Sequence, residues 1–349
     1  MPDPLSFTDQ SLTGEQREIQ RLARDFARTE IAPYAAQWDR DAYFEPELVR
    51  KLGTLGFLGM MVPEQYDGMG LDTLTYVVAL EEIAAADASV GVMMSLQNSI
   101  PTQLLLGFGN EAQKERYLRP MARGDMLGAF ALSEPGAGSD ATALTAQAIR
   151  DGDYWIVNGT KSWVTNGTVA GAILTQVRTD TPDDRKGSKG IGTFIVTRDL
   201  PGFHVSKKED KMGLRASPTV QLVFEDMRVP HENLVGDPSR GITYALHSLD
   251  SGRLGIAAQA VGIARSALQH SVAYAAERRQ FGKAIKDNQA IQFKLADMTT
   301  RITAARTLLH SAARAKDAGM RVTQMASMAK LFASETAMWV ATQAVQIFG

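Results

Sequence analysis

Cysteine is absent from the 349-residue chain, and histidine is scarce. Without cysteine, the chain has no disulfide framework, no thiolate nucleophile and no cysteine-ligated zinc site. The five histidines are never three or four positions apart, so no helix presents a pair of them to a metal ion. They are His204, His231, His247, His270 and His310. We therefore expect no metal centre.

An excess of either charge is also lacking. The chain carries 37 Lys and Arg against 39 Asp and Glu, which gives a formal net charge of −2. Nucleic-acid-binding domains usually carry a basic face, so this balance argues against DNA or RNA as a partner. No apolar run is long enough to span a membrane, and the first residues, MPDPLSFTDQ, do not resemble a signal peptide. We expect a soluble, cytoplasmic globular protein.

Helical patterns dominate residues 1–125. The first predicted helix starts near Thr13, where apolar residues begin to repeat at helical spacing. Further helices are predicted over 46–58, which begins with a proline, over 75–86, which follows an aspartate, and over 111–122. The predicted buried face of the first helix consists of Ile19, Leu22, Ala23 and Phe26.

Short apolar runs bounded by turn residues replace the helical pattern in residues 126–235. The pairs Asn158-Gly159 and Asn166-Gly167 predict hairpins, because both central positions of a type I′ turn need a positive φ. So many short strands in one segment indicate a small antiparallel sandwich or barrel.

The helical period returns in residues 236–349. The segments 256–275 and 322–348 are apolar and rich in alanine, and between them apolar residues step by three and four, as is typical of bundle packing. This seam consists of Ile291, Leu295, Met298, Ile302, Ala305, Leu309 and Ala312. We therefore predict an α+β fold of three domains: a helical domain (1–125), a β domain (126–235) and a helical domain of the four-helix-bundle type (236–349).

Three local motifs carry residues suited to ligand binding. Residues 130–140, FALSEPGAGSD, combine small residues and hydroxyls that can cradle a bulky or phosphorylated ligand, although an ordinary surface turn is the alternative. Trp163 and Thr165 share one face of a predicted strand, where a core tryptophan is the alternative. Residues 277–282, ERRQFG, end a helix with two arginines, which either recognise a pyrophosphate or complement the helix dipole.

Seven sequence blocks, taken together and in this order, resemble the flavin-dependent acyl-CoA dehydrogenases. The blocks are FGNEAQKERYL, FALSEPGAGSD, NGTKSWVTNG, KMGLRASPTVQLVFEDMRVP, LDSGRLGIAAQAVGIA, ERRQFGKAIKDNQAIQFKLADM and QAVQIFG. They are most similar to the short-chain, butyryl-preferring branch. The resemblance implies FAD as the cofactor and a helical domain, a β domain and a helical bundle in this order.

The resemblance also implies which residues contact the flavin ring. Phe130, Leu132 and Ser133 are expected to line the isoalloxazine and to bond its polar edge. Trp163 is expected to pack against the ring, and Thr165 to hydrogen-bond near the reactive N5 atom.

In this family, the FAD pyrophosphate lies across a subunit interface. Residues of one chain are therefore expected to serve the cofactor that is lodged in its neighbour. They are Arg278, Phe281, Gln289 and Gln346. This placement implies a homodimer, or a homotetramer built from two dimers.

For the thioester substrate, the resemblance implies that Ser139 touches the CoA arm and that three residues border the pantetheine path. These are Leu249, Asp250 and Arg253, the last with a routine salt bridge as its alternative. The implied reaction is α,β-dehydrogenation of a short- or medium-chain acyl-CoA to the trans-2-enoyl-CoA. A glutamate removes the α-proton while hydride leaves the β-carbon for flavin N5, and the electrons then pass to an electron-transfer flavoprotein.

The catalytic base is where the sequence departs from the family. The usual glutamate lies in a Tyr-Glu-Gly-Thr-type loop after the block that ends at Gly349, so we expect the base beyond this residue and the last domain to be incomplete. A minority of members carry the glutamate at the position of Gly252, and glycine cannot remove a proton. Asp250 lies about 200° around the helix from that position. The catalytic residue is therefore left unassigned.

Three alternatives remain open at this stage. A chain that naturally lacks the base is an FAD-binding pseudoenzyme, and the same scaffold also supports a flavin oxidase or monooxygenase. A nucleic-acid-binding module is the alternative from a different class, and the balanced charge argues against it.

Overall fold

The computed structural model describes residues 11–180 and 187–349. The first ten residues, in which the sequence predicts no signal peptide, lie outside the described part. The chain divides into two compact units. The helical unit consists of Met1–Ala36, Asp72–Ser95 and Arg253–Gly349, and the sheet unit consists of Gln37–Leu71 and Leu96–Gly252.

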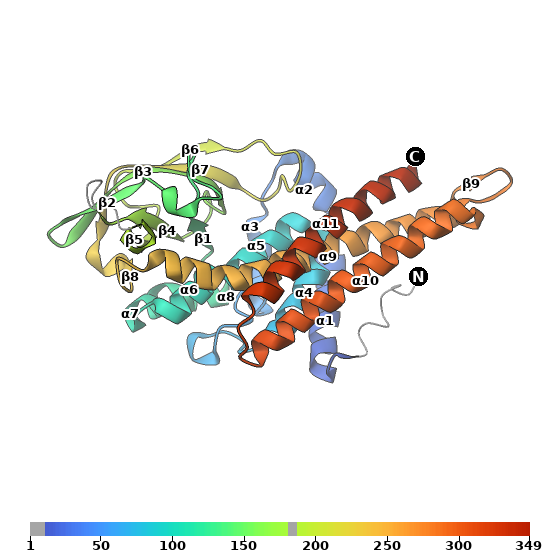
Figure 1. Cartoon of the computed structure of the whole chain (residues 1–349), viewed down its shortest axis with the longest axis horizontal. Helices are drawn as coiled ribbons and strands as arrows, with labels where there is room; N and C mark the ends of the chain where they lie inside the picture. Colours follow the sequence, from blue (N-terminus) through green and yellow to red (C-terminus); the bar gives the residue numbers. More distant parts are fainter. Residues whose placement is uncertain (1–10, 181–186) are drawn as a thin grey trace. The chain divides into compact units, whose positions relative to one another are not determined.

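The order of elements confirms the predicted α+β class, because helices precede and follow the strands of a sheet (Figure 1). The helices before the sheet are α1 (Gly14–Phe26), α2 (Ala35–Asp41), α3 (Pro46–Thr54), α4 (Thr73–Ala86), α5 (Ala88–Ser99), α6 (Pro101–Phe108), α7 (Glu111–Gln113) and α8 (Arg119–Arg123). Those after it are α9 (Gly241–Glu277), α10 (Gln289–Asp317) and α11 (Thr323–Phe348). None of the helices within the described ranges has the length and apolar character needed to cross a bilayer.

The first helix begins where the sequence predicts, but the face that it buries is only partly the predicted one. Thr13 caps α1, since its Oγ1 accepts a hydrogen bond from Gln16 N (3.1 Å). The predicted face is wrong for Leu22, which is 41% exposed, whereas Gln16 and Ala23 are buried. Gln16 Nε2 donates to Asp72 Oδ2 (3.1 Å) at the start of α4. Because of this hydrogen bond, the face of α1 that carries Gln16, and not the face that carries Leu22, is directed toward α4.

The next helix starts are confirmed, but α3 is shorter than predicted. Pro46 is the first residue of α3, and the helix ends at Thr54 instead of continuing to residue 58. The stop is a Schellman motif, in which Phe57 N donates to Leu52 O (2.9 Å) and Gly56 adopts a φ of 75°.

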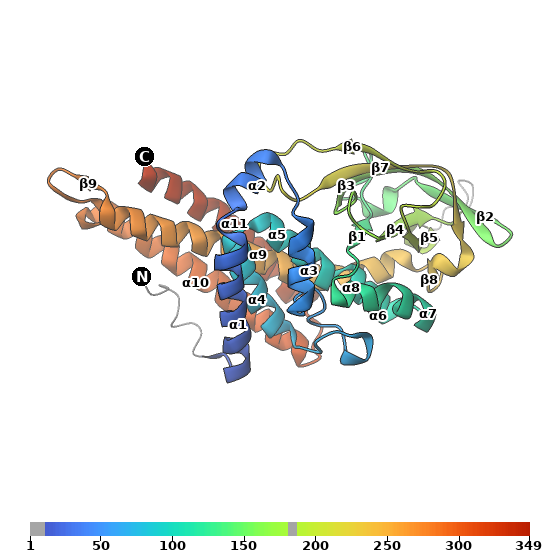
Figure 2. The ribbon, with the colours of Figure 1, turned by 180° about the vertical axis from the view of Figure 1, so that it is seen from behind.

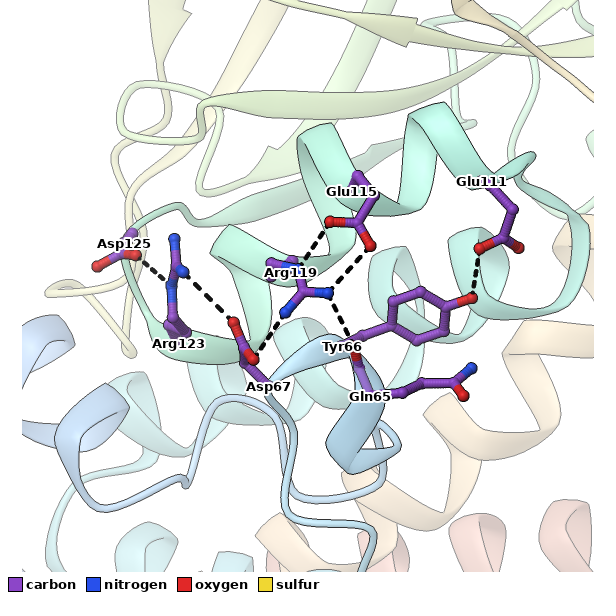
Figure 3. Close-up of polar contacts among 8 residues, drawn as sticks. All are labelled: Gln65, Tyr66, Asp67, Glu111, Glu115, Arg119, Arg123 and Asp125. Atoms are coloured by element: carbon purple, nitrogen blue, oxygen red, sulfur yellow. Dashed lines mark hydrogen bonds and ion pairs between the residues drawn. The ribbon is translucent and has the colours of Figure 1, made fainter.

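The predicted charged helix over 111–122 is present and contains a π-helical turn, η4 (Lys114–Leu118), between α7 and α8. Figure 3 shows how this segment holds the loop that follows α3. Arg119 donates to Asp67 Oδ1 (2.8 Å), Gln65 O (2.9 Å) and Glu115 Oε2 (2.8 Å). Asp67 has a φ of 60°, a backbone conformation that residues other than glycine rarely adopt, and its carboxylate is held by Arg119 and also by Arg123 (3.3 Å).

We expect Arg119→Ala to lower the urea midpoint of unfolding without changing its slope, because the variant loses the contacts of Arg119 with Asp67, Gln65 and Glu115 while the buried surface stays the same. Arg119→Lys is the control. It keeps the charge but loses the planar fork, and its midpoint should fall between those of the parent and the alanine variant. Equal midpoints for all three proteins would contradict a role of Arg119 in holding the loop.

In the helical unit, α10 and α11 form an antiparallel pair (Figure 1), and the predicted seam is largely confirmed. Its buried members are Met298, Ile302, Ala305, Leu309 and Ala312. Ile291 and Leu295, near the start of α10, are only half-buried.

The strands of the sheet unit form an eight-stranded sheet in the order β6-β7-β3-β2-β4-β5-β8, with β1 paired to β4. Their bounds are β1 (Gly128–Ala131), β2 (Gln147–Asp151), β3 (Tyr154–Thr165), β4 (Ala172–Arg178), β5 (Ile191–Val196), β6 (Phe203–Lys208), β7 (Thr219–Pro230) and β8 (Leu234–Val235). The prediction of a wholly antiparallel sheet is wrong, because β4 pairs in parallel with both β1 and β2.

Neither Asn-Gly pair forms the predicted hairpin. Asn158-Gly159 lies inside β3, at a register shift between β3 and β7. Asn166-Gly167 follows β3, but the next strand, β4, pairs with β1, β2 and β5 instead of returning along β3. The hairpin between β2 and β3 turns at Gly152-Asp153, where Gly152 has a φ of 58°. The signal for this turn was the Asp-Gly pair that precedes β3.

Candidate functional site

The segment after β1 is fixed against β3 by backbone hydrogen bonds. Residues 134–137 form a tight turn. In it, Glu134 N donates to Ala137 O (2.9 Å), and Ala137 N donates to Glu134 O (3.1 Å). Just before this turn, Ser133 O accepts a hydrogen bond from Ser162 N (2.8 Å) in β3. The backbone of Ser133 therefore lies next to the strand position that precedes Trp163.

A buried ion pair also holds the segment after β1 in place. Lys161 Nζ, whose side chain is fully buried, donates to Glu134 Oε1 (2.7 Å) and to Leu132 O (3.1 Å). The carboxylate of Glu134 also accepts hydrogen bonds from the backbone N–H groups of Thr145 (2.7 Å) and Ala146 (3.0 Å). Lys161 thus ties β3 to the loop on both sides of Ser133. The sequence interpretation missed this lysine, although its place in the middle of an apolar strand was a signal.

Both partners of this pair are charged at neutral pH. Burial lowers the pKa of Lys161 to about 8, and the charge of Glu134 opposes the shift. Burial raises the pKa of Glu134, but the charge and hydrogen bond of Lys161 outweigh it and hold the pKa below its usual value. The ion pair therefore persists at pH 7 and keeps the loop in one conformation.

The side chain of Trp163 is exposed at an irregular point of β3. Its backbone is left-handed, with a φ of 61°, and the pairing of β3 with β7 shifts register between Lys161 and Val164. The indole is 64% exposed. The alternative of a core tryptophan is therefore wrong for this residue. A bulge of this kind re-aims a side chain, and here it turns a flat aromatic surface outward beside the fixed loop.

The tryptophan of the sheet core is Trp155 instead. It is 6% exposed and meets the ring of Phe194 edge to face, with 5.3 Å between centroids. Its indole Nε1 donates to His231 Nδ1 (3.0 Å), so the polar edge of the ring is satisfied.

The other predicted flavin and CoA contacts of the sheet unit lie on or near the same strands. Phe130 on β1 is half-buried and stands opposite Leu174 of β4, and Thr165, also half-buried, stands opposite Thr219 at the end of β3. Leu132 is half-buried between β1 and the fixed turn, and Ser139 is exposed beyond it. The hydrogen bonds bring Leu132, Ser133 and the strand beside Trp163 together. Among the residues that the structure describes, no hydrogen bond holds Ser139 against them.

The predicted substrate residues lie on α9. Leu249, Asp250 and Arg253 are all half-buried, and Gly252 is buried. A Cβ added at Gly252 would lie 3.4 Å from Ile100 Cδ1, an ordinary van der Waals distance. The position therefore accommodates a Cβ without a clash, but glycine offers no proton acceptor.

The arginine-rich motif of the helical unit ends in an exposed hairpin. Strands β9 (Arg279–Gln280) and β10 (Lys283–Ala284) are joined by Phe281 and Gly282, whose φ values are 52° and 78°. The turn leaves Phe281 96% exposed. In Figure 1 this hairpin extends past the ends of α9 and α10. An exposed phenylalanine at the tip of a rigid turn is suited to contact with another molecule.

The four residues predicted to serve a neighbouring cofactor lie at one end of the helical unit. Arg278 follows the last residue of α9, Gln289 begins α10, and Gln346 is exposed near the end of α11. The ends of α9 and α11 touch, because Tyr274 stacks on Phe348 with 4.3 Å between ring centroids. This end of the unit therefore carries guanidinium, amide and aromatic groups. Within residues 11–180 and 187–349, no group of three or more His, Asp or Glu side chains is arranged to hold a metal ion.

Comparison with known sequences places the whole chain in one family. Models of the N-terminal, middle and C-terminal domains of acyl-CoA dehydrogenases match residues 13–125, 129–227 and 239–349, respectively. The short-chain specific acyl-CoA dehydrogenase of Mus musculus is 47% identical over 331 residues, which are 95% of this chain and 80% of the relative. An acyl-CoA dehydrogenase of Bacillus subtilis is 47% identical over 97% of this chain and 88% of its own length.

Solved structures agree with the sequences. The butyryl-CoA dehydrogenase of Megasphaera elsdenii superposes with a TM-score of 0.94 at 43% identity, over 98% of this chain and 89% of that one. A chain from a study of the electron transferring flavoprotein of Acidaminococcus fermentans superposes with a TM-score of 0.95 at 44% identity, over 98% and 89%. A glutaryl-CoA dehydrogenase of Mycobacterium smegmatis in complex with FADH2 gives 0.93 at 33% identity, over 99% and 88%. The chain belongs to the acyl-CoA dehydrogenase family.

Proposed function

We propose that the protein is an FAD-dependent acyl-CoA dehydrogenase of the short-chain type. It converts a saturated acyl-CoA to the trans-2-enoyl-CoA and passes the electrons to an electron-transfer flavoprotein. The observation that carries the proposal is the exposed indole of Trp163 beside the fixed backbone of Ser133. Support comes from relatives of the short-chain type that match most of the chain.

The residues of the sheet unit fit a flavin ring. Trp163 offers a flat apolar face, and Ser133 and Thr165 offer hydroxyl groups from the loop after β1 and from the end of β3. Because Lys161 and Glu134 hold the loop rigid, these groups are positioned before any cofactor binds. Preorganisation of this kind reduces the entropy cost of ordering the site.

Bound flavin supplies the acceptor for the hydride that leaves the β-carbon. The chain's own residues bind and orient the reactants: Trp163 covers one face of the ring, and the half-buried residues of α9 border the path of the thioester. The α-proton needs a carboxylate base, and Gly252 cannot serve as one. Asp250 lies about 200° around α9 from Gly252, so we assign no base among the candidate residues.

The direct test is spectroscopic. Purified protein supplied with FAD should become yellow after removal of free cofactor, and its indole fluorescence should be quenched in the parent but less so in Trp163→Leu. Butyryl-CoA added without oxygen should bleach the flavin absorbance of an enzyme that has its base. A protein that retains no FAD would overturn the proposal. Oxygen uptake that matches substrate turnover would identify an oxidase instead. Yellow protein that butyryl-CoA does not bleach would support the cofactor proposal and show that none of the residues present serves as the base.

The arginine after α9 gives a second test. We expect Arg278→Ala to lose FAD and to weaken the oligomer together, because we propose that its guanidinium binds the pyrophosphate lodged in a neighbouring subunit. Flavin content and sedimentation measure the two effects. Arg279→Ala, which alters the adjacent exposed residue, is the control and should retain both. Full flavin content and an intact oligomer in Arg278→Ala would show that the cross-subunit placement is wrong.

A further inference from the structure

A cavity lies entirely within the helical unit. Its volume is about 660 Å³, within the range of small-molecule sites. Its walls are formed by α1, the π-helical turn η2 (Ala27–Ile31), α4 and α9. None of the residues assigned above to the flavin or the thioester lines it.

The charged groups of this cavity leave a positive excess. Three arginines, Arg24, Arg28 and Arg265, face one carboxylate, Glu82. Both oxygens of Glu82 are engaged, since Arg24 Nη2 and Arg265 Nη1 each donate to Oε1 (2.7 Å), and Arg24 Nε donates to Oε2 (3.2 Å). The negative charge of Glu82 is therefore neutralised by Arg24 and Arg265. It does not compete with a ligand for Arg28.

Arg28 is the group available to a ligand. It is exposed and makes no hydrogen bond or ion pair with any residue that the structure describes. His270 also lines the cavity and is likewise without a partner among residues 11–180 and 187–349. Between them, Gln269 and Ser266 add an amide and a hydroxyl. These groups are donors suited to a carboxylate or a phosphate.

The rest of the wall is apolar and made of small side chains. They are Ala27, Ala32, Ala85, Ala86, Val272 and Ala273. The helix is widened here, because Ala32 N donates to Ala27 O (2.8 Å), five residues back. Such π-helical turns often occur at functional sites, and this one carries Arg28.

We propose that this cavity binds a small organic anion, with its carboxylate or phosphate group on Arg28 and its apolar part on the alanine wall. His270 and Gln269 complete the donor set. The site is separate from the proposed flavin site, so it can be tested without any acyl-CoA oxidation.

Titration calorimetry of the FAD-loaded protein with inorganic phosphate and with butyrate tests the proposal. We expect saturable binding of at least one anion, and Arg28→Ala should weaken it about tenfold or more. Arg21→Ala removes an exposed arginine of the neighbouring helix α1, outside the cavity, and should bind as the parent does. His270→Gln should weaken binding by a smaller factor.

The two anions distinguish the possible head groups. Binding of phosphate alone supports a phosphate ligand, binding of butyrate alone supports a carboxylate ligand, and circular dichroism establishes that each variant is folded. Saturable binding of neither anion overturns the proposal, as does equal binding by the parent and Arg28→Ala. A change of oligomeric state in Arg28→Ala without anion binding would also overturn it, since the cavity would then be a protein contact.

Discussion

Gly252→Glu in the 349-residue chain is expected to oxidise butyryl-CoA about a hundredfold faster than the parent chain, or more, since a positioned general base contributes on the order of 10²–10⁴ in rate. The resemblance to the family places the base of a minority of members at this position of α9. The structure accommodates the first atom of a side chain there, because a Cβ at Gly252 would lie 3.4 Å from Ile100 Cδ1 and 3.9 Å from Ser99 Oγ. Glutamate is also a better helix former than glycine, which offsets part of the cost of placing a carboxylate at this buried position.

Gly252→Gln is the matched control, because it has the same size and shape but no carboxylate. The glutamate variant alone should show anaerobic bleaching of the flavin by butyryl-CoA. Its rate should rise with pH through one ionisation, as the carboxylate must lose its proton to act as a base. Equal rates for the two variants would mean that the added volume, not a base, is responsible. A parent chain that already reacts as fast as Gly252→Glu would place the base elsewhere.

The positions of the helices could be predicted from the sequence. The face that a helix buries could not always be predicted. The cap at Thr13 and the proline at Pro46 act through the nearest few residues, so a local pattern suffices to predict them. The rotation of α1 is set by a residue far along the chain, since Gln16 bonds to Asp72. No local period contains that information.

The strands illustrate the same limit. A hairpin is predicted wherever Asn-Gly occurs, but Asn158-Gly159 lies inside β3, where Gly159 has a φ of 143° and a Cβ would come within 2.4 Å of Ala146 Cβ. The glycine is therefore required by the close approach of the neighbouring strand and not by a turn. Strand pairing across the sheet decides between these two uses of one dipeptide.

The motifs of the candidate site could be predicted from the sequence, but the arrangement of their side chains could not. Alternation places Trp163 and Thr165 on one face, but the bulge before Val164 and the left-handed φ of Trp163 break the alternation. The anchor of the loop, Lys161 with Glu134, joins segments 27 residues apart. Its partners come from β3 and from the loop after β1, so no local pattern predicts the pair.

The second large effect is expected in the core of the helical unit, where two glutamates of α4 are paired with buried arginines. Arg265 Nη1 donates to Glu82 Oε1 (2.7 Å) and lies 3.2 Å from Glu81 Oε1, and Arg306 Nε donates to Glu81 Oε2 (2.9 Å). All four side chains are at most 3% exposed. We expect Arg265→Met to lower the free energy of unfolding by about 3–5 kcal/mol, because it leaves buried carboxylates with less than their full complement of cations.

The paired variant Arg265→Met/Glu82→Leu separates the cost of a stranded charge from the value of the pair. It should be more stable than the sum of its single variants predicts, since no buried carboxylate at position 82 remains without its arginine. Urea titrations of the FAD-loaded protein at one protein concentration measure all of them on the same scale. Strict additivity would contradict a direct coupling of Arg265 to Glu82.

The same cluster fixes the sign of the pH dependence. Burial raises the pKa of Glu82, but Arg265 and Arg24 outweigh it and lower the pKa to about 2, below the ordinary value of 4.5. A carboxyl with a lowered pKa stabilises the fold fully above its unfolded value and loses this contribution as the pH falls through the folded value. About 3 kcal/mol should therefore disappear between pH 4.5 and pH 2 in the parent. Glu82→Gln cannot titrate at this position, so its stability should be lower at neutral pH and fall less steeply in acid. An acid limb as steep as that of the parent would assign the acid sensitivity to other carboxylates.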